Sequence, residues 1–166
     1  MKKIRINKID AARRQLDAAI RMTFDDEDPI AIHTVTAAAH RIIRDLCERR
    51  GDIEEYLRFR DWINPDHERE FWSYWNAAAS FMKHADKDPE AIHELEEEHS
   101  DFLVLISAKW YRELGYAPTP EMIVFGSWFA YGHPEILKAD PLSRAGITSE
   151  FATVAQMMKT FRVRAD

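Results

Sequence analysis

Apolar residues recur at helical spacing along most of the chain, and no alternating strand pattern extends beyond four residues. Asp28 before Pro29 is typical of a helix start, and Gly51 and Gly115 are typical of helix ends. The pattern therefore predicts an all-α fold, a single-domain bundle of six or seven helices over residues 1–166, with residues 1–8 as a flexible basic arm. We expect the helices at residues 9–24, 29–50, 52–60, about 66–82, 88–114, 120–132 and from about 148.

The spacing of apolar residues also predicts which face of each helix enters the core. In the first helix Asp17 is expected outside. The expected core positions are Ile9, Ala12, Leu16, Ala19, Ile20 and Thr23 in the first helix, Ile32, Val35, Ala39, Ile42 and Leu46 in the second, and Phe151, Val154, Met158 and Phe161 in the last.

The aromatic segment that begins at Phe71 predicts a core helix, because apolar side chains point in almost every direction. A polar stripe interrupts it, formed by Ser73, Asn76, Ser80 and Lys83, with His84 beside them. Buried amides and hydroxyls need partners, since each one left unpaired costs about 1–3 kcal/mol. The partner is either a neighbouring protein group or a ligand.

A second polar stripe lies beside the expected core face of the second helix, at His33, Ala37, His40 and Arg44. Seven residues are close to two turns, so the two histidines project from one side, either as a structural pair or as part of a site. Alanine triplets at 37–39 and 77–79 would let the second and fourth helices approach closely. That contact predicts one ligand-binding cluster of His33, His40, Asn76, Ser80, Lys83 and His84.

An eight-residue frame occurs twice, as DEDPIAIH at residues 26–33 and DKDPEAIH at residues 86–93. Both copies predict a helix start with a capping aspartate. The repeat is either convergent capping chemistry or a duplicated hairpin or paired site.

The AIHT and KHADKDP segments, at residues 31–34 and 83–89, resemble an uncharacterised bacterial all-helical family with AIHT and KHADxDP segments. The likeness spans about residues 29–89. It implies a bacterial, cytoplasmic protein and no known activity.

Charge is unevenly spread over the 166 residues, whose formal net charge is −6. Such a charge disfavours a nucleic-acid coat. Residues 1–24 carry seven Lys or Arg against two Asp, whereas residues 86–101 carry eight acids against one lysine. We expect the basic segment to dock on the acidic one. A solvated tail and an RNA-contacting arm are the alternatives.

Cys47 is the only cysteine, so no intramolecular disulfide forms, which fits a reducing compartment. The first ten residues lack the apolar stretch of a signal peptide. The strongest apolar runs, 102–108 and 122–131, are shorter than the roughly 18 residues of a membrane span. We expect a cytoplasmic protein with no membrane contact.

Most familiar catalytic signatures are absent from the sequence, including a Gly-rich phosphate loop, HExxH and paired cysteines. Histidine with carboxylate suits several transition metals, so a metal stays open, although no cofactor is identified. The possible ligands are His33, His40, His84, Asp86, Asp88, His93 and Glu97. Two Glu-x-x-His pairs, ending at His93 and His99, lie on one expected helix and point apart, unlike those of di-iron bundles.

The stretch Arg60-Asp61-x5-His67 resembles the Arg-x4–6-His motif of HEPN ribonucleases, which are small helical bundles. The resemblance implies Arg60 and His67 as a catalytic pair acting on RNA. Pro65 departs from the family pattern, in which a helix presents both residues.

Tryptophan is abundant, and we expect Trp62, Trp72 and Trp110 to exceed what one core holds, which favours a homodimer with an aromatic interface. We therefore expect a protein that binds a small ligand or metal at the six-residue cluster. The alternatives are an HEPN-like RNA-binding protein or ribonuclease and a purely structural homodimer.

Overall fold

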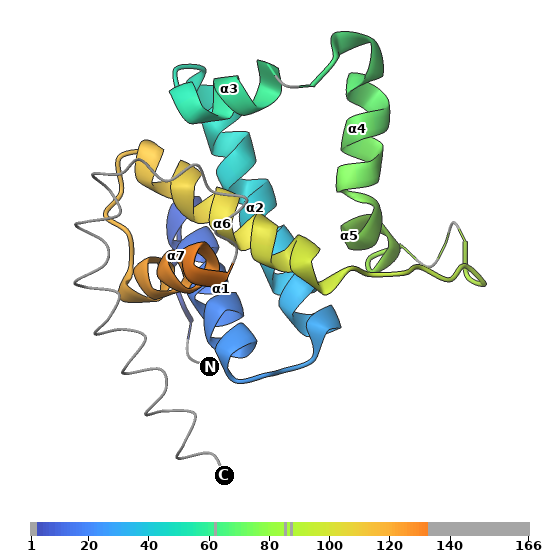
Figure 1. Ribbon diagram of the computed structural model, residues 1–166, viewed down its shortest axis with the longest axis horizontal. Coiled ribbons are helices and arrows are strands. Elements are labelled where there is room, and N and C mark those ends of the chain that lie inside the picture. Colours follow the sequence, from blue (N-terminus) through green and yellow to red (C-terminus); the bar gives the residue numbers. More distant parts are fainter. Residues whose placement is uncertain (1–2, 62, 85, 87, 133–166) are drawn as a thin grey trace. The chain divides into compact units, whose positions relative to one another are not determined.

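The computed structural model describes residues 3–61, 63–84, 86 and 88–132, and within them the chain is helical without any strand (Figure 1). The prediction of an all-α fold is confirmed. The predicted helix from about residue 148 lies outside the described residues. The elements are α1 (Lys8–Phe24), α2 (Pro29–Arg50), α3 (Glu54–Asp61), the 3-10 helix η1 (Pro65–His67), α4 (Glu68–Trp75), α5 (Ala77–Phe81), α6 (Glu97–Glu113) and α7 (Pro120–Gly132).

The chain divides into two compact units, the first ending at Thr119 and the second beginning at Pro120. The first unit contains α1 to α6 and all the candidate residues of the ligand cluster. In the second unit α7 buries Met122, Phe125 and Phe129, and the last two rings stack at 6.3 Å. The single-domain expectation stays a prediction. None of the described helices has both the length and the apolar character needed to cross a bilayer.

The core of the first unit lies where α1 and α6 pack on α2 (Figure 1). Helices α2 and α6 run in the same direction, because residues 33 and 40 of α2 pair with residues 100 and 107 of α6. Burying this apolar surface contributes roughly 25 cal/mol per Å². The fully buried apolar side chains include Ala12, Leu16, Ala19, Ile20, Ala39, Ile43, Cys47 and Val104.

Side chains cap the starts of α1 and α2, and the cap of α2 is the predicted one. Asn7 Oδ1 accepts a hydrogen bond from the Asp10 amide at 2.8 Å, and Asp28 Oδ1 accepts from Ile30 and Ala31. Gly51 has φ of 73° and ends α2 in the left-handed region, where a side chain would be strained. These predicted boundaries are confirmed to within one residue.

The core faces of α1 and α2 differ from the prediction. Asp17 is buried, where its carboxylate accepts from Arg13 at 3.2 Å and from the Thr119 hydroxyl at 2.6 Å. The inner face of α2 is rotated toward the polar stripe, whereas Val35, Ile42 and Leu46 are only half-buried. Polar side chains tolerate burial when they are hydrogen-bonded, and partners on α6 satisfy the histidines of this stripe. The buried stripe comprises His33, Thr36, Ala37, His40 and Arg44.

The aromatic segment is not the continuous core helix that its sequence predicts. It breaks at Asn76 into α4 and α5, where the Trp72 carbonyl accepts from both the side-chain amide of Asn76 at 2.6 Å and its backbone amide at 3.1 Å. No residue of α4 is fully buried, and Tyr74 is 73% exposed. Helix α4 is therefore a half-buried element at the edge of the unit.

The two copies of the DxDP frame have different structures. Asp28 begins α2, but the second copy forms only a turn in which the Asp88 carbonyl accepts from Ala91, and α6 begins at Glu97. Acidic residues four apart follow the second copy and repel one another on a helix, and Ile92 is 94% exposed rather than facing a core. The expected start at residue 88 is wrong, and these segments form no duplicated hairpin.

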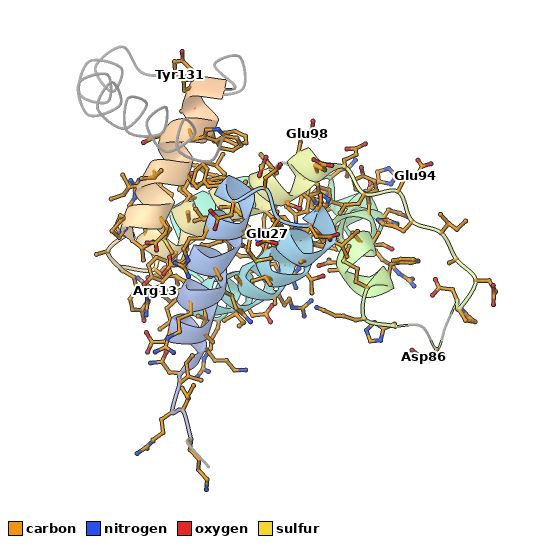
Figure 2. All side chains as sticks on the ribbon, turned by 90° about the horizontal axis from the view of Figure 1, so that it is seen from below. Arg13, Glu27, Asp86, Glu94, Glu98 and Tyr131 are labelled. Carbon is orange, nitrogen blue, oxygen red and sulfur yellow. The ribbon has the colours of Figure 1, made fainter. Side chains whose placement is uncertain are left out.

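The expected docking of the basic segment on the acidic one stays a prediction. Lys3, Arg5 and Lys8 are exposed and form no ion pair with a described residue. Asp86 and Glu94 lie on the far side of the unit from Arg13 (Figure 2).

Candidate ligand pocket between α2, α5 and α6

A pocket of about 260 Å³ opens where α2, the α4–α5 break and α6 meet. All six residues of the predicted cluster line it, so residues up to 51 positions apart in the sequence converge at one place. Whether they bind a ligand remains a prediction. The complete lining is His33, Ala37, His40, Arg41, Trp75, Asn76, Ala79, Ser80, Lys83, His84 and Leu103.

Small side chains create the space for this pocket. Helix α5 packs against α2, as the two alanine triplets predict, and Ala78 is buried at the contact. Ala37 and Ala79 line the pocket from opposite helices. A larger residue at either position would occupy the volume, so the alanines serve both the helix contact and the opening.

Two histidine–serine pairs join α2 to α6. His33 Nδ1 lies 3.0 Å from Ser100 Oγ, and His40 Nδ1 lies 3.0 Å from Ser107 Oγ. The same seven-residue spacing occurs on both helices, so the pairs form two equivalent rungs between parallel helices. Neither serine is among the residues predicted from the sequence to form the site. Their signal is the seven-residue interval between the two serines of α6, which matches the interval between the two histidines of α2.

His40 is held at both ring nitrogens. The Trp75 indole N–H donates to His40 Nε2 at 3.2 Å. An indole nitrogen only donates, so Nε2 accepts, and Nδ1 carries the proton that it donates to Ser107. Burial, followed by the charge of Arg44, lowers the pKa of His40 to about 3. His40 is therefore a neutral structural group with no nitrogen left for a metal or a ligand.

His33 differs from His40 at its second nitrogen. The side chain is only 1% exposed, Nδ1 faces Ser100, and Nε2 makes no hydrogen bond to any described residue. Nε2 is thus the ring nitrogen left to a molecule in the pocket. Burial, and then the neighbouring His99, His93 and Lys83, lower the pKa of His33 to about 4.

His99 lies beside His33, although it is not one of the six residues predicted to form the ligand-binding cluster. Its ring centroid lies 5.4 Å from that of His33 and 5.6 Å from that of Trp75, and burial lowers its pKa. The prediction that His93 and His99 point apart assumed one continuous helix. Because residues 88–96 are not helical, that prediction does not apply, and His93 stacks on Phe81 instead.

The charged groups on the pocket wall are all basic. Arg41 and Lys83 line the pocket, and no aspartate or glutamate does. Arg41 Nε is paired with Asp45 at 3.0 Å on the exposed side of α2. Lys83 is exposed and forms no ion pair with another residue that the structure describes. His84 Nδ1 lies 3.9 Å from Asp86 Oδ1, beyond hydrogen-bonding distance.

Trp75 forms the aromatic wall of the pocket and connects it to a cluster of rings. It stacks with Phe71 and packs edge-on against Phe59 and Phe102. Two of the three tryptophans that favoured a dimer have partners within this unit. Trp110 is buried, and the Arg44 guanidinium lies 4.9 Å from the Trp72 ring. Trp62 lies outside the described residues.

The other chemical candidates do not form comparable sites. Among the residues that the structure describes, no three His, Cys, Asp or Glu side chains are grouped to hold a metal ion. Arg60 pairs with Glu68 at 2.8 Å, whereas the exposed His67 lies 3.3 Å from Glu70. Cys47 is buried, and burial raises the pKa of its thiol to about 12, so it is not a reactive thiolate.

Comparison with known proteins gives no relative from which a function could be transferred. No family model, curated protein or solved structure matches the chain.

Proposed function

We propose that this protein binds a small organic anion in the pocket between α2, α5 and α6. The observation that carries the proposal is the charge of the residues that line the pocket. They include two cationic side chains and no carboxylate, although the chain has 29 acidic and only 23 basic residues. An anionic group would meet Lys83 and Arg41 without repulsion from an acid of the wall. Charge-assisted hydrogen bonds of this kind are among the stronger ones in proteins.

The remaining wall suits an organic rather than an inorganic anion. Trp75, Leu103 and the two alanines supply apolar surface, and Asn76 and Ser80 supply a few polar contacts. Ligand sites combine apolar surface with placed polar groups, and this wall contains both kinds of side chain. The volume of about 260 Å³ is below the roughly 300–1,000 Å³ of most ligand pockets, which favours a molecule with a single ring or a short chain.

Isothermal titration with benzoate, with neutral benzamide as its matched analogue, tests the proposal. We expect saturable 1:1 binding of benzoate and at least about tenfold weaker binding of benzamide, because the latter lacks the charge. Inorganic phosphate in a third titration distinguishes a general anion site from one that uses the apolar wall. Equal affinity for benzoate and benzamide, or no binding of benzoate, would contradict the proposal.

A lysine variant connects the binding to the pocket. Lys83→Met keeps the aliphatic stem and removes the charge, so we expect benzoate affinity to fall about five- to tenfold, as for loss of one charge-assisted contact. Lys8→Met, at an exposed lysine of α1 outside the pocket, is the matched control and should bind benzoate as the parent does. An unchanged affinity in Lys83→Met would move the site elsewhere.

We further propose a cytoplasmic, bacterial protein that assembles as a homodimer, as the sequence analysis predicts. Light scattering at micromolar concentration measures the oligomeric state, and a monomer there contradicts the homodimer. An RNA-directed role gains no specific observation, because Arg60 and His67 are each next to a different glutamate.

A further inference from the structure

The two histidine–serine rungs offer a comparison within one molecule. Both histidines are buried on α2, and each has a serine of α6 at 3.0 Å from Nδ1. They differ at Nε2: Trp75 occupies that of His40, whereas that of His33 has no partner in the described residues. Only the His33 rung therefore has a ring nitrogen without a partner in the described residues.

We propose that His33 is the histidine that contacts the bound anion and takes up a proton when the anion binds, whereas His40 is a fixed structural element. This inference rests on the proposed function. The proton comes from solvent and attaches to His33 Nε2, which then donates a charge-assisted hydrogen bond to an oxygen of the anion. Nδ1 retains its contact with Ser100.

The surroundings of His33 supply the reason for proton uptake. The titratable and charged groups that face it are Arg41 and His40 from α2, Lys83 and His84 after α5, His93 before α6, and His99 from α6. All of them are cationic or become cationic on protonation, and the pocket wall contains no carboxylate. An empty pocket therefore disfavours a charged imidazole, in agreement with its pKa of about 4. A bound anion introduces the missing negative charge and favours the protonated ring.

Proton-linked binding is measured by titrating the full-length protein with benzoate at pH 6 in two buffers of different ionisation enthalpy. We expect uptake of about half a proton per benzoate at pH 6, falling toward zero at pH 8, and affinity that rises as pH falls from 8 to 6. Benzamide should show no uptake. Benzoate binding without uptake at pH 6 would overturn the inference and leave the proposed function standing, whereas no benzoate binding would overturn both.

Two variants identify the residue that takes up the proton. His33→Gln should abolish the uptake, and His84→Gln, at the exposed histidine of the pocket, should retain it. Loss of uptake in His84→Gln with retention in His33→Gln would overturn the assignment. If His33→Gln does not fold, the imidazole NMR signals of the parent protein decide: a His33 ring whose pKa rises on addition of benzoate supports the inference, and one whose pKa is unchanged overturns it.

The serines provide a matched pair that leaves both imidazoles in place. Ser100→Ala removes the Nδ1 partner of the His33 rung and should change the proton uptake on benzoate binding. Ser107→Ala removes the equivalent partner of the His40 rung and should leave the uptake as in the parent. The reverse result would show that the His40 rung exchanges the proton and would overturn the inference.

Discussion

The Trp75 indole donates a hydrogen bond to His40 Nε2 at 3.2 Å, and this bond ties the end of α4 to the middle of α2. On the other side of the same imidazole, Ser107 binds Nδ1, so one histidine connects three helices. Trp75 also lines the pocket. The position of the pocket wall is therefore set by a bond that also holds the edge helix in place.

Replacing the indole by a ring without a donor should weaken this connection. Trp75→Phe keeps an aromatic contact with Phe71 and Phe59 but leaves His40 Nε2 unpaired, and we expect a loss of about 1–3 kcal/mol in the free energy of unfolding. Urea denaturation of the variant and the parent protein measures this loss in the free energy of unfolding. The control is Tyr74→Phe at the exposed neighbour, for which we expect a change of less than about 0.5 kcal/mol. Equal effects of the two variants would mean that the bond does not stabilise the fold.

The buried imidazoles should make the protein acid-sensitive well above the range in which carboxylates titrate. A histidine of the unfolded chain has a pKa of about 6.5, whereas the folded values are about 4 for His33 and about 3 for His40. Below pH 6.5 the unfolded chain binds more protons than the folded one. Stability is therefore fully present above about pH 6.5 and falls as pH is lowered toward 4 for His33 and 3 for His40.

Urea midpoints between pH 7.5 and 5 measure this dependence. We expect a progressive decrease, with a shallower slope in His33→Gln, which removes one of the titrating groups. His67→Gln is the control, because His67 is exposed and pairs only with Glu70. A midpoint that does not vary between pH 7.5 and 5, or a slope that His33→Gln leaves unchanged, would show that the folded protein accommodates the charged rings.

The two DxDP frames provide a test of capping at matched sequence. Asp28→Ala removes the acceptor for two amides at the start of α2 and should cost about 0.5–2 kcal/mol of stability. Asp88→Ala, in the copy that forms only a turn, should cost less than about 0.5 kcal/mol. Thermal unfolding of both variants makes the comparison. A similar loss in both would mean that the second aspartate also caps a helix in solution.

These frames also show what the sequence can and cannot predict. Capping and glycine signals are local, so the ends of α2 follow from neighbouring residues. A helix start also needs an apolar face to bury, and the acids after Asp88 provide none, so tertiary context decides between two nearly identical frames. The break at Asn76 is accompanied by a side-chain bond to the Trp72 carbonyl, and neither feature follows from periodicity.

The candidate site was predictable from the sequence to a similar extent. Helical spacing places His33 and His40 on one side of α2, and the alanine triplets predict the approach of α5, so the six residues could be grouped. Their separate roles could not be predicted, because those depend on Ser100, Ser107 and Trp75 from other elements. Periodicity gives the direction of a side chain along its own helix but does not identify the residue that faces it.

Filling the pocket should abolish binding without disturbing the rungs. Ala79 lines the pocket from α5 and is only half-buried, so Ala79→Leu directs three additional carbon atoms toward open volume rather than into a packed core. We expect benzoate binding to fall below detection in titration while the unfolding free energy changes by less than about 1 kcal/mol. Ala77→Leu, on the same helix but outside the pocket wall, is the control and should bind benzoate as the parent does. Undiminished binding in Ala79→Leu would mean that benzoate occupies another surface, because a leucine side chain and an aromatic ring cannot share about 260 Å³ that is already narrow for one ligand.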